Sequence, residues 1–182
     1  PDYIQIIISP GNHDAVRRAE PQPTFSEDIV KEIEQNGRGN IHFTGSPCNL
    51  LIEGLRVLTY HGTSLDSVIA SIPGMSYSEP EKPMVELLKR RHLSPIYGDN
   101  PIVPEARDYM VIDQVPDIMV MGHIHKNGYA NYNGTAVINS GTWQDRTDFQ
   151  RQQGHIPSPC LMPIYNLRYS RLDLVNFRGN GE

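Results

Sequence analysis

The stretch from Asp117 to His125 reads DIMVMGHIH, an apolar run that leads directly into two histidines. A continuous apolar run is typical of a strand that is buried on both faces of a sheet. Further along, Asn133-Gly134 separates the strand patterns of 129–132 and 135–138, which is a strong signal for a two-residue hairpin turn. The sequence therefore predicts a buried strand that ends in a histidine-bearing turn and is followed by a hairpin.

Two other segments share this design. The isoleucine run from Ile4 to Ile8 predicts a buried strand, which stops at a Pro-Gly pair and is followed by Asn12-His13-Asp14. Leu55 to Tyr60 predicts another strand, which is followed by His61-Gly62. Turns at strand ends place side chains at the rim of a rigid sheet, and glycine lets the backbone bend sharply there. We therefore expect the chemistry of the chain at one edge of its sheets.

The rest of the chain mixes helix and strand patterns. We expect helices over 26–36, 65–72 and 83–92, strands over 41–45 and 50–53, and one or two closing strands within 162–177. Prolines interrupt regular structure between 92 and 115, and residues 178–182 form a polar tail. Without an internal repeat, this order predicts an α/β or α+β layered domain.

The composition predicts one ordinary soluble domain, with 182 residues, a net charge of −5 and 38% hydrophobic residues. No apolar run approaches the roughly 18 residues that a membrane helix needs, and no signal-peptide pattern is present, so we expect no membrane association and no secretion. Cys48 and Cys160 lack CxxC spacing and are interpreted as packing residues. The acidic balance argues against attraction of nucleic acid to the whole surface, but bound cations or a local basic patch can still recruit phosphate.

The three polar turns together indicate a metal site. In an extended backbone His123 and His125 point to the same face while Ile124 faces the core, so the two imidazoles can hold one cation or two adjacent ones. Taken singly, His61 has the features of an ordinary surface or capped residue, and Asn12 those of a turn residue. Imidazole and amide ligands suit Mn²⁺, Fe²⁺ or Zn²⁺ better than Mg²⁺.

The order Gly-Asn-His-Asp, His-Gly and Gly-His-Ile-His, followed by a hairpin and Asn139-Ser140-Gly141, resembles the second half of the calcineurin-like metallophosphoesterase superfamily. Five longer stretches are similar to the small subunits of the archaeal D-family DNA polymerases. They are PGNHDAVRRAEPQP (10–23), HGTSLDSVIASIPGMSY (61–77), LLKRRHLSPIY (87–97), VIDQVPDIMVMGHIH (111–125) and WQDRTDFQ (143–150).

This resemblance implies an α/β fold of four layers, a β-sandwich flanked by helices. It also implies that the protein acts as a 3′–5′ exonuclease through a two-metal phosphodiesterase site. It implies that Asn12, His61 and His123 hold one divalent cation and that His125 binds the other. Mn²⁺ is the first choice, with Fe²⁺, Zn²⁺ or Mg²⁺ as alternatives. His13 would be the catalytic residue, oriented by Asp14. The implied partners are the large catalytic polymerase subunit and DNA with a 3′ end, in the cytoplasm at the archaeal nucleoid.

The superfamily also has an Asp-x-His and a Gly-Asp-x-x-Asp segment upstream of Gly-Asn-His-Asp, and neither occurs before Gly11. We therefore expect residues 1–182 to be the C-terminal portion of a metallophosphoesterase domain, incomplete at its N-terminus and weakly active or inactive by itself. A variant that has lost its nuclease and serves as an assembly subunit is the alternative. A phosphatase or phosphodiesterase of the same superfamily that acts on other phosphoesters is another.

Several further residues carry open interpretations. Arg17, Arg18 and the cluster 89–91 are candidates for contacts with DNA phosphates, although the cluster equally fits a solvated helix face. Trp143 and Phe149 are candidates for stacking on bases or on a partner, or for packing in the core. The histidines at 42, 92 and 155 receive no predicted role.

Overall fold

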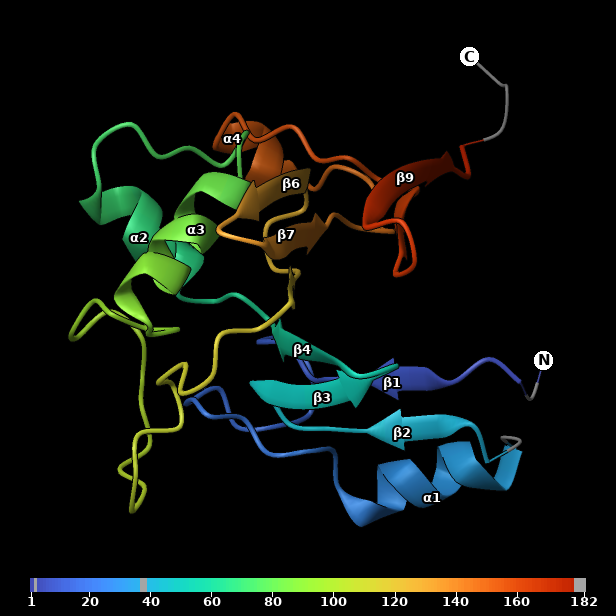
Figure 1. Ribbon diagram of the computed structural model, residues 1–182. Coiled ribbons are helices and arrows are strands. Elements are labelled where there is room, and N and C mark those ends of the chain that lie inside the picture. Colours follow the sequence, from blue (N-terminus) through green and yellow to red (C-terminus); the bar gives the residue numbers. More distant parts are fainter. Residues whose placement is uncertain (2, 37–38, 179–182) are drawn as a thin grey trace.

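The computed structural model describes residue 1 and residues 3–36 and 39–178. Its centre is a mixed five-stranded sheet in the order β3-β4-β5-β7-β6 (Figure 1). The strands are β3 (Cys48–Ile52), β4 (Leu55–Tyr60), β5 (Ile118–Met121), β6 (Asn127–Tyr132) and β7 (Thr135–Ser140). Strands β4, β5 and β7 are parallel, while β3 and β6 run antiparallel at the two edges. The mixed α/β fold class predicted from the sequence is confirmed.

Both faces of this sheet are covered. On one face, side chains such as Leu58 and Met119 pack against α2 (Leu65–Ser71) and α3 (Glu81–Arg90) in the larger core cluster. The other face carries a smaller cluster that includes Val57 and meets the hairpin of β8 (Leu161–Asn166) and β9 (Arg171–Asn176). Alternate residues of β4 thus point into different cores, as the strand period requires. The continuous apolar run of β5 follows from this two-sided burial.

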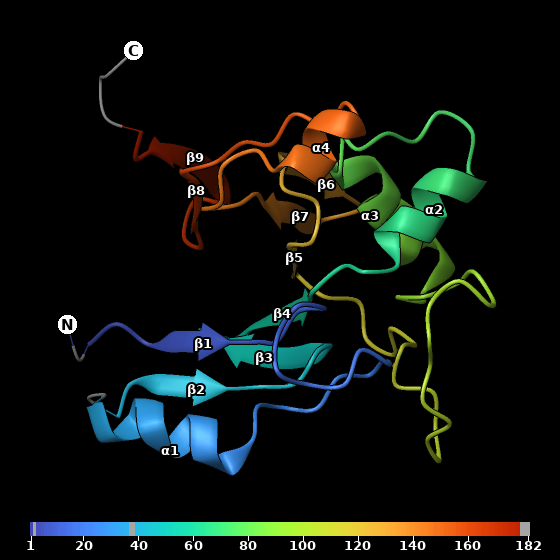
Figure 2. The same cartoon turned by 180° about the vertical axis from the view of Figure 1, so that it is seen from behind.

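The first strand differs from its prediction. Strand β1 (Ile6–Ile8) pairs in parallel with β2 (Ile41–Phe43) in a separate two-stranded sheet, beside which lies α1 (Glu27–Asn36) (Figures 1 and 2). The strand forms, but the prediction that it is buried is wrong, because Ile6 and Ile7 are 42% and 37% exposed. Within the described residues β1 has β2 as its one strand neighbour, so these isoleucines keep contact with water.

The second half of the chain contains one helix that the sequence pattern did not indicate, α4 (Asp148–Gln152), which begins with a capping box at Thr147. The proline-rich region between 92 and 115 forms no helix or named strand, as predicted. Of the predicted polar tail, residues 179–182 lie outside the described residues. In the described parts of the chain, no helix is long and apolar enough to cross a bilayer.

Candidate functional site

The three polar turns meet at one end of the fold. Asn12 and His13 come after β1, His61 follows β4, and His123 and His125 come after β5. All five line one cavity of about 890 Å³. The structure thus brings together every residue that the sequence nominates for metal binding or catalysis. Part of the reason is that β4 and β5 are parallel neighbours, so that their carboxyl ends coincide.

Asn12 and His61 are in direct contact. Nε2 of His61 lies 2.8 Å from Oδ1 of Asn12, and the His61 and His123 rings meet edge to face with their centroids 5.2 Å apart. Gly11 makes this arrangement possible, because a Cβ at that position would lie 2.6 Å from Cε1 of His61. The backbone therefore approaches this imidazole more closely than a residue with a side chain would allow.

The imidazole of His61 is held in its neutral form. Burial, and after it the neighbouring His123, lowers the pKa of His61 from 6.5 to about 4. Burial and His123 also lower the pKa of His125 from its usual value. Neutral imidazole is the form of histidine that binds divalent metals. Both side chains are therefore ready for that role at neutral pH.

The turn after β5 is not extended. His123 has a left-handed backbone conformation with φ of 56°. We expected His123 and His125 to share a face because side chains alternate along an extended strand. That reason is wrong, because β5 ends at Met121 and the chain bends. Both imidazoles nevertheless line the cavity, and Ile124 is buried in the core as predicted. A non-glycine residue in this conformation persists only where its surroundings hold it.

Asn139 supplies that support. Its Nδ2 donates to the backbone oxygen of Ile124 at 2.6 Å and to that of Lys126 at 2.7 Å. Asn139 lies on β7, where it pairs in register with Met121 of β5, and it is only 1% exposed. A buried amide on the neighbouring strand therefore fixes the backbone of the histidine turn.

His123 has a carboxylate partner that sequence reasoning missed. Its Nε2 lies 2.8 Å from Oδ2 of Asp66, in the first turn of α2. Burial acts to raise the pKa of Asp66, but the hydrogen bond and charge of His123 outweigh it, so the pKa is lowered. The two residues are 57 positions apart, and no local pattern indicates that they meet.

Gln150 and His155 were missed as well. Nε2 of Gln150 lies 2.8 Å from Nδ1 of His125. Oε1 of Gln150 accepts from the N–H of Thr147, and this contact orients the amide so that its NH₂ group faces His125. The His155 ring stacks on Tyr77 with centroids 4.2 Å apart, and both rings line the cavity. Gln150 and His155 therefore belong to the lining of the same cavity as the metal-binding candidates.

Asp14 has a different role from the one expected. Its Oδ2 accepts from the N–H of Gly11 at 2.7 Å, so the carboxylate closes its own turn. His13 is exposed at the rim of the cavity. The structure therefore places His13 where an incoming ligand would meet it, and it leaves Asp14 as a turn residue.

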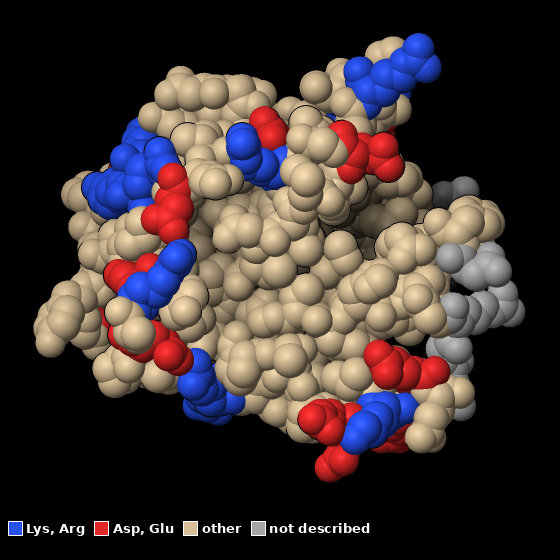
Figure 3. Space-filling model, turned by 60° about the horizontal axis from the view of Figure 1, so that its bottom comes forward, with Lys and Arg blue, Asp and Glu red and all other residues tan. Residues whose placement is uncertain are grey.

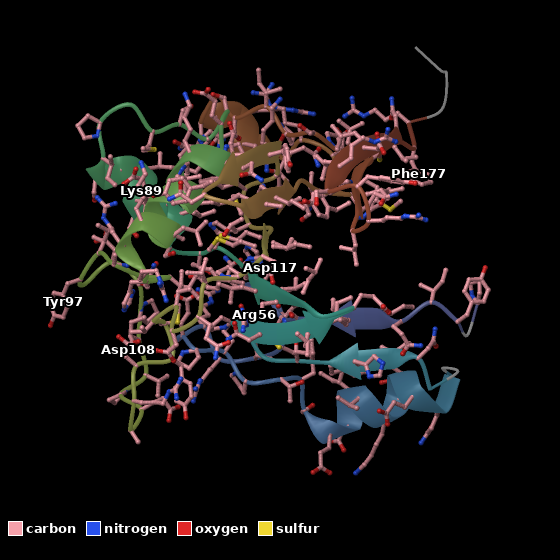
Figure 4. All side chains as sticks on the ribbon, in the orientation of Figure 1. Arg56, Lys89, Tyr97, Asp108, Asp117 and Phe177 are labelled. Carbon is pink, nitrogen blue, oxygen red and sulfur yellow. The ribbon has the colours of Figure 1, made fainter. Side chains whose placement is uncertain are left out.

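The basic candidates are engaged elsewhere. Lys89 and Arg90 both pair with Glu86 on the surface of α3, where Figure 4 labels Lys89. The Arg91 side chain donates to backbone oxygens, and Arg17 donates to a backbone oxygen and to a glutamate. None of them is among the described residues that line the cavity. The solvated-face interpretation of 89–91 fits the structure.

The donors fit a cation in part. Oδ1 of Asn12 and Nε2 of His61 are as close as two adjacent ligands of one ion, which lie about 3 Å apart when each bond is about 2.1 Å. Within 1, 3–36 and 39–178, however, no group of three or more His, Cys, Asp or Glu side chains is placed to hold a metal. The described residues thus supply part of a coordination sphere.

Comparison with known proteins identifies relatives. The DNA polymerase II small subunits of Methanocaldococcus jannaschii, Archaeoglobus fulgidus and Thermoplasma acidophilum are 52%, 51% and 44% identical to the chain. These matches cover 92%, 91% and 96% of this chain but only 28%, 33% and 35% of the relatives. The chain therefore spans about a third of their length.

A solved structure described as a novel archaeal phosphodiesterase aligns with 94% of this chain and 68% of its own, at 15% identity and a TM-score of 0.43. A superposition this loose carries no argument about the site. The family of DNA polymerase alpha/epsilon B subunits, in contrast, matches residues 2–129, which include the turns that bear Asn12, His61 and His123. The chain belongs to this family, the B subunits of the alpha/epsilon DNA polymerases.

Proposed function

We propose that the chain carries part of the active site of a 3′–5′ exonuclease, which removes nucleotides from a DNA 3′ end as the small subunit of an archaeal replicative polymerase. The observation that carries this proposal is the contact between Asn12 and the neutral His61, because it joins two metal donors from turns far apart in sequence. Among the described residues that line the cavity are five histidines and Lys126, against one carboxylate, Asp66. Because burial lowers the pKa of His61 and of His125, attraction of an anionic phosphodiester would come from Lys126 and from the cations that the histidines would hold.

The proposed roles are those that the family resemblance implies. Asn12, His61 and His123 would hold one divalent cation, Mn²⁺ first, and His125 would bind the second. Two such ions, when bound, polarise a phosphoryl oxygen and provide a hydroxide nucleophile. His13 is exposed and lines the cavity, so it would meet the phosphodiester and donate a proton to the leaving oxygen.

We expect this chain by itself to hydrolyse DNA weakly. The second cation has one donor among the described residues, His125, and its Nδ1 already accepts from Gln150. A single imidazole does not hold a cation against water at ordinary metal concentrations. The substrate, DNA with a 3′ end, and the partner, the large catalytic subunit, are proposed from the polymerase names of the relatives. We propose accordingly that the chain acts on DNA in the cytoplasm, at the archaeal nucleoid.

A second candidate is an assembly subunit without catalysis, which keeps a partial metal site. The specific observation in its favour is that the described residues contain no group of three or more His, Cys, Asp or Glu side chains placed to hold a metal. Its structural prediction is that the chain binds the large polymerase subunit equally well with and without Mn²⁺.

The test measures two quantities as Mn²⁺ is added: release of 3′ nucleotides from labelled single-stranded DNA, and binding of the large catalytic subunit. For the exonuclease we expect Mn²⁺-dependent release by the complex, reduced at least about 100-fold by His61→Ala. His42→Ala is the matched control, because His42 bonds Gln5 on the β1–β2 side of the molecule and should leave release unchanged. Association with the large subunit without any Mn²⁺-dependent release would favour the assembly role.

A further inference from the structure

The cavity has two chemically different walls. One wall consists of the metal-binding candidates, and the other is formed by the segment from Gln144 to Pro157, which includes α4. Among the described residues, the members of the second wall include no lysine, arginine or carboxylate side chain: Gln144, Thr147, Phe149, Gln150, Gln153, His155, Ile156 and Pro157. We call this segment the α4 wall.

Two large apolar side chains of the α4 wall are mostly exposed to solvent. Phe149 is 67% exposed and Ile156 is 68% exposed, although both line the cavity. Apolar side chains that line a cavity without covering one another indicate a ligand with an apolar face. Trp143 is exposed as well, but it differs from these two residues. Its ring contacts that of Phe177, with centroids 5.5 Å apart, and it does not line the cavity.

Phe149 is held in a defined place. It lies in α4, whose start is closed by the reciprocal hydrogen bonds of Thr147 and Gln150. Gln150 also contacts Nδ1 of His125, so the helix that carries Phe149 is tied directly to the metal-binding side of the cavity. A ligand centred on the histidines therefore has this aromatic ring within the same cavity.

We propose that the α4 wall binds an unpaired nucleobase of the DNA strand whose phosphodiester lies at the histidines, with Phe149 as the stacking side chain. This inference rests on the proposed function and adds to it that the substrate is recognised through a base as well as through phosphate. Stacking on an aromatic ring tolerates every base, because each has a π-face. The amides of Gln144 and Gln153 both donate and accept, so they can meet the edge of any base.

The experiment compares two single-stranded probes of about 12 nucleotides, one complete and one whose 3′-terminal nucleotides lack bases. Equilibrium binding to this chain is measured by fluorescence anisotropy with Ca²⁺ in place of Mn²⁺. We expect Phe149→Ala to weaken binding of the complete probe about tenfold and binding of the abasic probe less than about twofold. Phe149→Tyr should bind as the unaltered chain does, and Phe149→Leu, which is apolar but lacks a π-face, should behave like Phe149→Ala.

Tyr97→Ala is the matched control, because Tyr97 is a fully exposed aromatic residue in a loop outside the cavity (Figure 4) and should change neither affinity. The inference is overturned if Phe149→Ala weakens both probes equally, if it weakens neither, or if the unaltered chain does not distinguish the probes. The proposed hydrolysis is scored separately, as release of nucleotides by the complex with the large subunit in the presence of Mn²⁺. Base-dependent binding without release would end the exonuclease proposal alone, and release without base dependence would end this inference alone.

Discussion

One face of the His61 imidazole is covered by backbone, since Gly11 lies where any side chain would collide with the ring. This contact places the ring against Asn12 and keeps water from it, which is why its pKa falls to about 4. The glycine-bearing polar turns predicted that chemistry gathers at one edge of the sheets, and the assignment of Asn12 and His61 to one cation came from the family resemblance. The edge-to-face contact of His61 with His123 depends on the packing of separate strands and could not be predicted from either turn.

Replacement of Gly11 by alanine should disturb the site more than replacement of Gly122. The new Cβ at Gly11 would lie 2.6 Å from Cε1 of His61, and we expect a loss of about 1–3 kcal/mol in the free energy of unfolding together with weaker Mn²⁺ binding. At Gly122 the nearest atom would be 3.8 Å away, an ordinary contact. Urea unfolding and Mn²⁺ titration of both variants provide the measurement, and equal effects would contradict the prediction.

The depressed pKa of His61 makes stability depend on pH in a defined window. The unfolded chain protonates this imidazole near pH 6.5, whereas the folded chain resists protonation until about pH 4. Its contribution is therefore present above pH 6.5 and is lost as the pH falls toward 4, by up to about 3 kcal/mol. Urea unfolding with metal chelated, at several pH values, should show a shallower decline for His61→Gln than for the unaltered chain. Parallel declines would show that His61 is not the group responsible.

Among the elements, the strands that lead into the turns were the most predictable. The apolar runs of β4 and β5 are long and end in glycine or histidine, and the Asn133-Gly134 turn sets the β6–β7 hairpin. Helix α4 was not predictable, because five residues without buried side chains have no apolar period to detect. The partners Asp66, Gln150 and His155 were missed for a related reason, since each meets the site through contacts made only in the folded chain.

The support that β7 gives to the histidine turn can be removed at Asn139. Replacement by alanine leaves the backbone oxygens of Ile124 and Lys126 without this donor, and we expect a loss of about 2–4 kcal/mol in the free energy of unfolding. Asn131→Ala is the control, because Asn131 makes one exposed bond of 3.2 Å to the hairpin turn and should cost less than about 1 kcal/mol. Urea denaturation of both variants tests the difference. A similar cost for both would mean that the turn is held by other contacts.

On the scale of the whole molecule, exposed apolar side chains also lie outside the cavity. Ile4 and Ile6 near β1 are 48% and 42% exposed, and Leu174 and Phe177 at the other end are 52% and 55% exposed. On the face shown in Figure 3, basic and acidic side chains alternate around the margin and most of the middle is uncharged. With a net charge of −5, the surface as a whole does not favour a polyanion, so the proposed binding of DNA would depend on the cavity and on the cations proposed for it.

The exposed isoleucines of β1 should make the isolated chain self-associate. Ile6→Lys places a charge on this strand, and we expect less association at micromolar concentrations with a change below about 1 kcal/mol in the free energy of unfolding. Ile118→Lys is the contrasting variant, because Ile118 is 5% exposed and its replacement should cost more than about 4 kcal/mol. Sedimentation velocity and urea unfolding measure both properties. Unchanged association of Ile6→Lys would place the contact elsewhere.

The single amide of Gln150 has a consequence for motion. It closes the start of α4 through Thr147 and at the same time holds the ring of His125. Fraying of that short helix therefore releases the His125 imidazole in the same event. The motion of the His125 ring is thus coupled to local unfolding of α4. A DNA strand bound to α4 as proposed would therefore reduce the motion of the His125 ring without contacting it.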